Sequence, residues 1–223
     1  MADRRAFRLC LVTLVALTGC ARGLAPDEQA FATALFGDSL DVQPIVVQAG
    51  LGLTPLPSPE PIDPDAPPAR ALPEGVCDRV PSPRQGFQLP AGAVLWNQVF
   101  LKRDFYRADM MQGWPRAVPV PHVLLMTHEL VHVWQWQNRS RTDYDPATSG
   151  GESVASLDPY FYTPDADRAF LAYGFEQQAA MIEDYVCYTL FDPTSPRRKD
   201  LFDLINPVLP LDRFNAQLGR HAQ

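Results

Sequence analysis

Apolar residues recur along this chain at spacings that predict helices. The longest apolar stretch surrounds a short polar motif at about 121–138, which indicates a buried helix that begins near Pro121. A second strong helical pattern extends from about 165 to 190. A shorter one begins at Pro26 and ends at Gly37, since glycine commonly terminates helices. Residues 197–220 predict one or two further short helices.

Two other apolar segments have the composition of β-strands. Residues 43–48 contain Ile-Val-Val, and residues 94–101 predict the best strand of the chain, with Val94, Trp96 and Phe100 on one face. We expect these strands to form a small antiparallel sheet. The predicted fold class is therefore α+β, with helix predominating.

Segments poor in apolar periodicity separate these elements. Residues 54–90 contain eleven prolines and predict an extended loop, because proline removes a backbone donor and breaks helices and central strands. Residues 139–166 are rich in Gly, Pro, Tyr and Asp and predict a second long loop. The expected organisation is an N-terminal helix and strand at 20–53, the proline-rich loop, and a metal-binding domain at 91–223.

The first nineteen residues have the pattern of a lipoprotein signal peptide. Three arginines precede an apolar stretch at 9–17 that is too short to span a bilayer. The following Leu17-Thr18-Gly19-Cys20 resembles a bacterial lipobox, which implies a lipidated Cys20; an ordinary secretory signal is the alternative. Ala21, rather than Asp, follows the cysteine. We therefore expect a lipid-anchored protein of the bacterial cell envelope, sorted to the outer membrane and facing the periplasm.

Charge and cysteine content restrict the partners. The formal charge of −7 becomes −9 when residues 1–19, with three arginines and one aspartate, are removed. This acidity argues against a nucleic-acid partner, and lipid rather than basic residues would hold the membrane. Cys77 and Cys187 remain beside Cys20 in the mature chain. In an oxidising compartment they could pair or stay free, and no C-x-x-C spacing indicates a cysteine metal site.

The polar motif inside the 121–138 helix is H-E-x-x-H. Residues four apart lie on one helix face, so His128 and His132 can direct both imidazoles at one metal ion. Glu129 is rotated by about 100° from His128 and can reach a metal-bound water without ligating the metal. The alternative is a pair of core histidines with no metal. The carboxylate at the expected place favours the metal site.

A catalytic zinc site requires a third protein ligand. His122 projects away from the motif face, and His221 lies at the C-terminus, where chains are usually mobile. On the 165–190 helix, Glu176 and Glu183 share one stripe with two alanines that would permit close helix packing. We expect Glu176 to bind the metal and Glu183 to accept a histidine N–H. The reverse assignment, with Glu183 as the ligand, is the main rival.

These residues together resemble a known class of enzymes. H-E-x-x-H followed by a glutamate on a later helix is similar to the gluzincin branch of zinc metallopeptidases. With the segments 36–38, 125–135 and 176–179, the chain resembles more closely a little-characterised group of bacterial H-E-x-x-H proteins, some of them Vgr-related or associated with contractile injection systems. The resemblance implies a zincin-like domain over most of 27–190.

Residue by residue, the resemblance implies that His128, His132 and Glu176 bind Zn²⁺ and that Glu129 is the general base. Two departures concern the activity. The span from His132 to Glu176 is long, and no downstream His or Tyr motif marks a residue that stabilises the transition state. The tyrosines in or beside the 139–166 loop are candidates for that role: Tyr144, Tyr160, Tyr162 and Tyr173.

The expected function is that of a membrane-anchored zinc peptidase, which hydrolyses a peptide or protein substrate with a zinc-activated water. The strand at 94–101 could pair with an extended substrate. Two other interpretations remain open. One is a zinc-binding envelope lipoprotein without turnover, serving as a structural or secretion-accessory module. The other is a proline-rich adaptor, which would leave the H-E-x-x-H motif unexplained.

Overall fold

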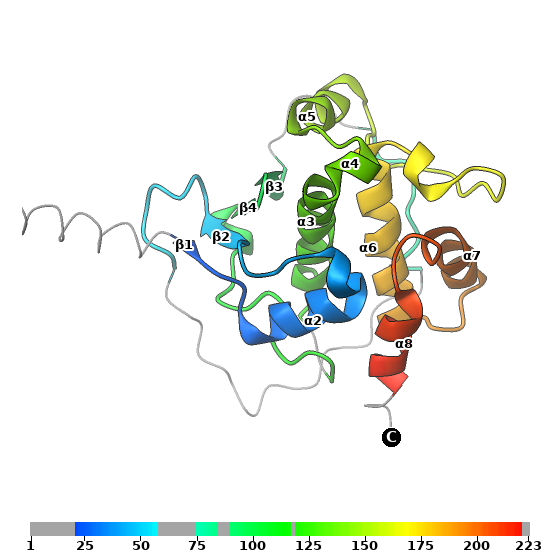
Figure 1. Ribbon diagram of the computed structural model, residues 1–223, viewed down its shortest axis with the longest axis horizontal. Coiled ribbons are helices and arrows are strands. Elements are labelled where there is room, and N and C mark those ends of the chain that lie inside the picture. The colour runs from blue at the N-terminus through cyan, green and yellow to red at the C-terminus, as the bar shows by residue number, and fades with distance from the viewer. Residues whose placement is uncertain (1–20, 58–74, 84–89, 117–118, 220–223) are drawn as a thin grey trace, which may run out of the picture.

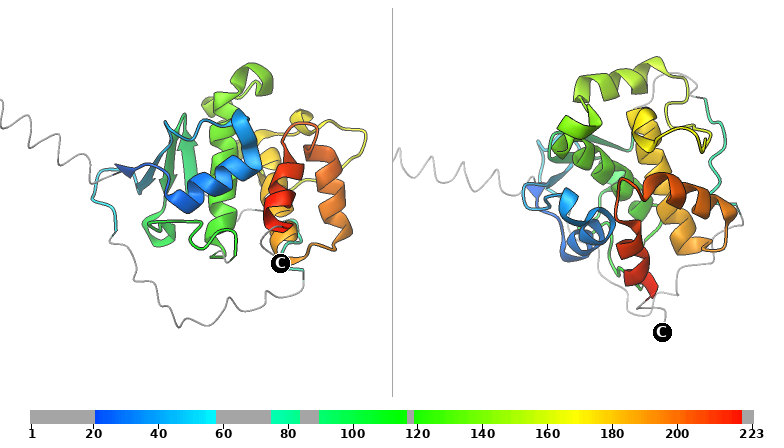
Figure 2. Two further views of the ribbon diagram at one scale, coloured as in Figure 1. Left: turned by 60° about the horizontal axis from the view of Figure 1, so that its bottom comes forward. Right: turned by 45° about the vertical axis from the view of Figure 1, so that its right-hand side comes forward.

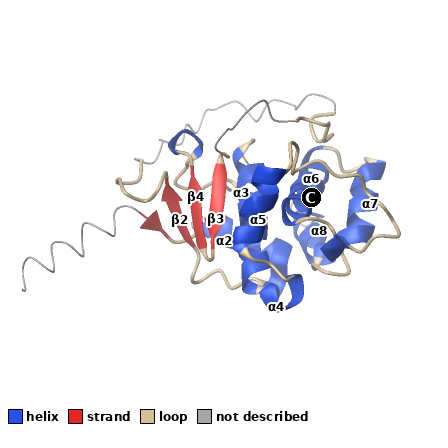
Figure 3. Ribbon diagram, turned by 90° about the horizontal axis from the view of Figure 1, so that it is seen from above, coloured by secondary structure: helices blue, strands red, loops and turns tan. Residues whose placement is uncertain are grey.

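The computed structural model describes residues 21–57, 75–83, 90–116 and 119–219. Its architecture is α+β with helix predominating, which confirms the predicted fold class (Figure 1). The sheet lies on one side of the molecule, the helix α3 (His122–Gln137) follows it, and the helices α6 (Phe175–Phe191) and α7 (Pro196–Ile205) lie beyond (Figure 3). The predicted signal segment with Cys20, parts of the proline-rich segment and His221 lie outside the described residues.

Four short strands form the sheet, in the order β1-β2-β4-β3. Their bounds are Ala21–Arg22 (β1), Val46–Ala49 (β2), Gly92–Leu95 (β3) and Gln98–Leu101 (β4). β2 and β4 are parallel, with Val47 opposite Val99, whereas β1 and β3 pair antiparallel with their neighbours. The expectation of an antiparallel sheet is therefore wrong. A long connection separates β2 from β4, which allows the crossover that parallel pairing requires.

The segment predicted as one strand at 94–101 is a hairpin. Trp96 and Asn97 form the turn between β3 and β4, and Trp96 has a positive φ of 59°. The chain reverses there, so the predicted face does not exist: the Trp96 side chain is 48% exposed. Val99 and Leu101 point into the core instead. A bulky residue rarely adopts a left-handed conformation, and Trp96-Asn97 lacks the Asn-Gly or Asp-Gly pattern typical of two-residue turns.

The two predicted central helices are present, with one corrected boundary. α3 agrees with the expected 121–138 helix, and most of its apolar residues are buried, apart from the half-buried Leu124, Leu125 and Trp136. α6 begins at Phe175 rather than near 165, because Gly174 ends the preceding loop and its N–H is capped by the Gln177 side chain at 3.1 Å. α3 and α6 pack side by side in the middle of the fold (Figures 1 and 2).

The expected loop at 139–166 contains two helices. α4 (Arg139–Thr142) continues closely from α3, and α5 (Pro146–Ala155) follows. Asp145 caps α5 by accepting a hydrogen bond from the Thr148 N–H at 3.0 Å, and Pro146 occupies the first helical position. These are ordinary start signals, but two glycines in the segment conceal the helix.

The remaining helices close the core from the other side. α2 (Pro26–Phe36) ends at Gly37, as predicted, and packs against α8 (Leu211–Gly219). Phe31 of α2 and Phe214 of α8 meet edge to face, with ring centroids 5.8 Å apart. Among the described residues, no helix combines the length and apolarity needed to cross a membrane.

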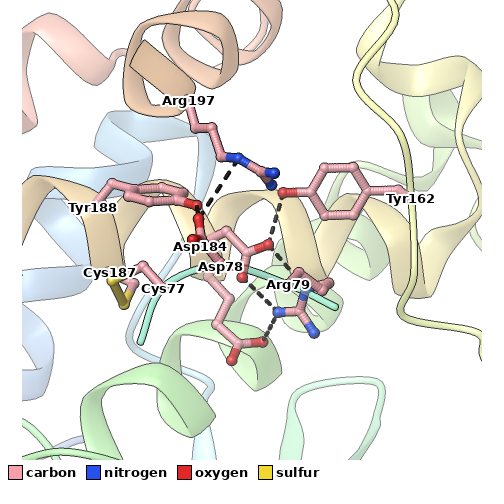
Figure 4. Close-up of a disulfide and its surroundings, with 9 residues drawn as sticks. Cys77, Asp78, Arg79, Tyr162, Asp184, Cys187, Tyr188 and Arg197 are labelled. Atoms are coloured by element: carbon pink, nitrogen blue, oxygen red, sulfur yellow. Dashed lines mark hydrogen bonds and ion pairs between the residues drawn. A yellow bond between two sulfur atoms is a disulfide. The ribbon is translucent and has the colours of Figure 1, made fainter. Parts of the chain in front are cut away.

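A disulfide joins Cys77 to Cys187 of α6 (Figure 4). It fastens the described segment 75–83 along α6. The connectivity is the pairing that the sequence left open. Both cysteines are buried, so this link forms part of the core.

Candidate metal centre

The helix α3 brings the two motif histidines together. Their i, i+4 spacing places both rings on the face directed at α6, and the two Nε2 atoms lie 3.3 Å apart. Both residues are buried, with 8% of His128 and 5% of His132 exposed. Two imidazole nitrogens in this position can bind the same metal ion.

Glu176 in the first turn of α6 completes the group. Its Oε2 lies 3.1 Å from His128 Nε2 and 3.3 Å from His132 Nε2. The two alanines of the same stripe, Ala179 and Ala180, are fully buried and let α6 approach α3 closely. The three donor atoms can therefore hold a metal ion between the two helices.

Glu183 lies on the other side of the His128 ring. Its Oε2 is 3.2 Å from His128 Nδ1, so it contacts the nitrogen that points away from the three-donor group. Of the two glutamates that the sequence suggests as ligands, Glu176 lies at the Nε2 atoms of both histidines, and Glu183 contacts His128 only at Nδ1. A carboxylate at Nδ1 fixes the ring and leaves Nε2 for a metal.

His132 has a corresponding partner that sequence reasoning missed. Its Nδ1 lies 2.8 Å from Gln135 Oε1, and the Gln135 amide nitrogen donates to Gln178 Oε1 and to the Phe175 carbonyl, both at 3.1 Å. Because the amide nitrogen is engaged, Gln135 presents its oxygen, and His132 Nδ1 is the donor. The signal was available, since Gln135 is three residues from His132 on the same helix face.

The electrostatics of the group favour a bound cation. Burial alone would lower the pKa of His128, but its hydrogen bonds with Glu176 and Glu183 outweigh burial and raise the pKa to about 10. Burial would raise the pKa of Glu176, but His132 and His128 outweigh it and keep that pKa below its usual range. Without a metal, a proton on His128 thus takes the place of the positive charge.

Glu129 is beside the donor group but not part of it. Only 3% of the residue is exposed, and its Oε2 has no hydrogen-bond partner among the described residues. Burial raises the pKa of Glu129 to about 7. The carboxylate lies over Gly92 of β3, where a Cβ atom would be 2.3 Å from Glu129 Oε1. Burying an unpaired carboxylate oxygen costs free energy, and such oxygens are therefore rare outside functional sites.

These residues open into a cleft of about 690 Å³. Its lining includes Ala91 and the β3 residues Gly92, Ala93 and Val94, together with residues of α5 and of the segment 75–83. Of the four tyrosines proposed from the sequence, Tyr144 and Tyr160 line the cleft, with ring centroids 6.0 Å from His132 and 5.5 Å from His128, respectively.

The other residues considered from the sequence lie elsewhere. Tyr162 donates to Asp184 at 2.7 Å, and Tyr173 accepts from the Asp165 N–H at 2.9 Å, so neither hydroxyl faces the donor group. His122 lies at the start of α3, next to Arg107 at 3.2 Å.

Three comparisons with known proteins yield a single match, to a solved structure. No family model matches the chain, and none of the curated proteins matches it. Among solved structures, the chain is similar to one described as "Effector domain of Pseudomonas aeruginosa VgrG2b", with 18% identity and a TM-score of 0.49. The match covers 84% of this chain and 83% of that chain. The interpretation of the site therefore rests on the geometry of its own residues.

Proposed function

We propose that this protein is a zinc-dependent peptidase in which His128, His132 and Glu176 bind one Zn²⁺. Donors about 2.0–2.1 Å from a tetrahedral zinc lie about 3.3 Å apart. The donor atoms here are 3.1–3.3 Å apart, which supports that geometry. Two imidazoles and one carboxylate are also a donor set of catalytic zinc sites, which leave the fourth position open.

The observation that carries a catalytic rather than a structural role is the buried Oε2 of Glu129, which has no hydrogen-bond partner among the described residues. A site that only stabilises the fold needs no base and usually completes its coordination with protein ligands. Glu129 instead keeps a buried oxygen unpaired beside the donor group, inside the cleft. This placement supports an enzyme over the non-catalytic zinc module.

The chain's own residues account for the proton transfers. When bound, zinc lowers the pKa of a water molecule and polarises the scissile carbonyl. Glu129 accepts a proton from the attacking water and returns it to the leaving nitrogen. In the metal-free protein, burial raises the pKa of Glu129, which makes this carboxylate a stronger base than an exposed glutamate.

The cleft supports an extended peptide as the substrate. β3 is at the edge of the sheet, and among the described strands it pairs with β4 alone. Its free side borders the cleft, so a peptide main chain can add to this strand. Glu129 lies directly over Gly92 of β3 and would stand next to the scissile bond of such a peptide.

We also propose, from the sequence alone, that a lipidated Cys20 anchors the enzyme to the cell envelope. This part of the proposal is independent of the metal centre.

Glu129→Gln tests the proposed activity. The amide keeps the shape of the carboxylate but cannot accept a proton, so zinc content and fold should be unchanged while hydrolysis of a broad peptide library falls about 10²–10⁴-fold. His128→Ala, measured in parallel, should lose zinc and activity together. If wild type binds zinc but neither it nor Glu129→Gln cleaves any peptide, the non-catalytic module replaces this proposal.

A further inference from the structure

The described segment 75–83 is held against α6 at three successive residues. Cys77 is bonded to Cys187, the Tyr188 hydroxyl donates to Asp78 at 2.6 Å, and Arg79 reaches the α6 carboxylates (Figure 4). The segment also lines the cleft through Arg79 and Val80. It therefore connects the disulfide with the rim of the metal centre.

Arg79 forms a two-pronged contact with Asp184. Its Nε donates to Oδ2 at 2.9 Å and its Nη2 to Oδ1 at 2.6 Å, a geometry that only a guanidinium provides. The Tyr162 hydroxyl donates to the same Oδ2 at 2.7 Å, which fixes the carboxylate from a second direction. Arg79 is thus immobilised on one side, with 21% of its side chain exposed.

The same guanidinium reaches the oxygen that supports a histidine. Arg79 Nη2 is 3.2 Å from Glu183 Oε2, and that oxygen is also 3.2 Å from His128 Nδ1. Glu183 is therefore a bridge between Arg79 and His128. The Glu183 side chain is 23% exposed. Without Arg79, water would compete with His128 for this carboxylate, and the like charge of Asp184 would repel it.

We propose that Arg79 is a positioning residue of the metal centre, acting on His128 through Glu183, and that the Cys77–Cys187 disulfide holds Arg79 in place. This inference rests on the proposed metal site. A group that hydrogen-bonds a ligating histidine typically contributes about 10–100-fold to metal affinity. Glu183 is that group for His128, and because Arg79 and the disulfide act through Glu183, their loss should lower affinity by no more than that factor. Neither Arg79 nor the disulfide contacts any of the three donor atoms.

The test uses the full-length chain and zinc competition with a chromophoric chelator. Arg79→Gln should lower zinc affinity by up to about 100-fold, and Arg79→Lys less, because lysine keeps the charge but loses the fork to Asp184. The pair Cys77→Ser/Cys187→Ser should produce a similar loss. Arg197→Gln is the matched control: it removes the ion pair of Arg197 with Asp78 on the same segment but no contact with Glu183, and should leave affinity unchanged.

A double-mutant cycle gives the specific readout. Once the cysteines are replaced, Arg79→Gln should reduce affinity little further, because the disulfide acts through the arginine. Full additivity, or wild-type affinity in a folded Arg79→Gln or Arg79→Lys variant, overturns the inference. Absence of zinc binding in wild type would instead overturn the metal site itself. The Co²⁺-substituted proteins add a second readout, since a displaced His128 should change the ligand-field spectrum.

Discussion

Replacing Gly92 by alanine should displace the Glu129 carboxylate without changing its chemical identity, and so tests whether its position matters for activity. A Cβ atom at position 92 would lie 2.3 Å from Glu129 Oε1 and 2.6 Å from its Cδ. Ordinary van der Waals contact begins at about 3.4 Å, so the carboxylate must retreat by about 1 Å. The moving atoms end a side chain, and the backbone of Gly92 does not have a positive φ, so the fold should tolerate alanine.

A displacement of about 1 Å in a reacting group can reduce the rate about 10²-fold. We therefore expect Gly92→Ala to lower kcat/KM for peptide hydrolysis by about that factor while zinc affinity stays at the wild-type value, because none of the three donor atoms moves. Circular dichroism and a thermal melt establish that the variant is folded. Zinc affinity is read by chelator competition.

Gly150→Ala is the matched control. Gly150 also lines the cleft, but a Cβ atom there would meet nothing within 4 Å, and it lies in the helix α5, where alanine is favoured. Wild-type activity in Gly92→Ala would refute the assigned position of Glu129. Equal losses in both glycine variants would show that the cleft responds to any added methyl group.

Three further predictions concern the proton, the ligand set and the anchor. Since the pKa of His128 is raised to about 10 without metal, zinc must displace its proton, and zinc affinity should rise about tenfold per pH unit between pH 6 and 8; a flat profile contradicts this. Glu176→Ala should weaken zinc binding far more than Glu183→Ala in chelator competition, and the reverse order would make Glu183 the ligand. Cys20→Ser should abolish acylation, and the variant should no longer partition into the detergent phase; unchanged partitioning would refute lipid anchoring.

The parts of the site that follow from local periodicity could be predicted from the sequence. His128 and His132 lie together because residues four apart share a face of α3. Glu176 and Glu183 share a face of α6 and lie nearly two turns apart along it. Which of the two glutamates reaches the Nε2 atoms of both histidines depends on how α6 is rotated and shifted against α3, and no pattern within either helix determines this. Packing decided it.

The contacts that depend on long-range placement were not predictable. Arg79 and Glu183 are far apart in the chain, and a pairing of two cysteines cannot be deduced from sequence with certainty. The hairpin at Trp96 was missed because a tryptophan in the left-handed region contradicts local preference. Alternation over 94–101 could not reveal a reversal that its own residue types disfavour.

The cysteine pair also encloses the site in the sense of chain topology. Cys77 and Cys187 are 110 positions apart, and all of the proposed ligands and Glu129 fall inside the covalent ring they close. In the chain-entropy model, closing a ring of roughly 100 residues lowers the conformational entropy of the unfolded state, which stabilises the folded state by about 4.7 kcal/mol. An oxidised chain that unfolds therefore keeps α3 and the ligand-bearing part of α6 within one closed ring, whereas α2, α7 and α8 lie outside it. Refolding around a metal would begin from this closed ring, in which the search that brings the ligand helices together is already shortened.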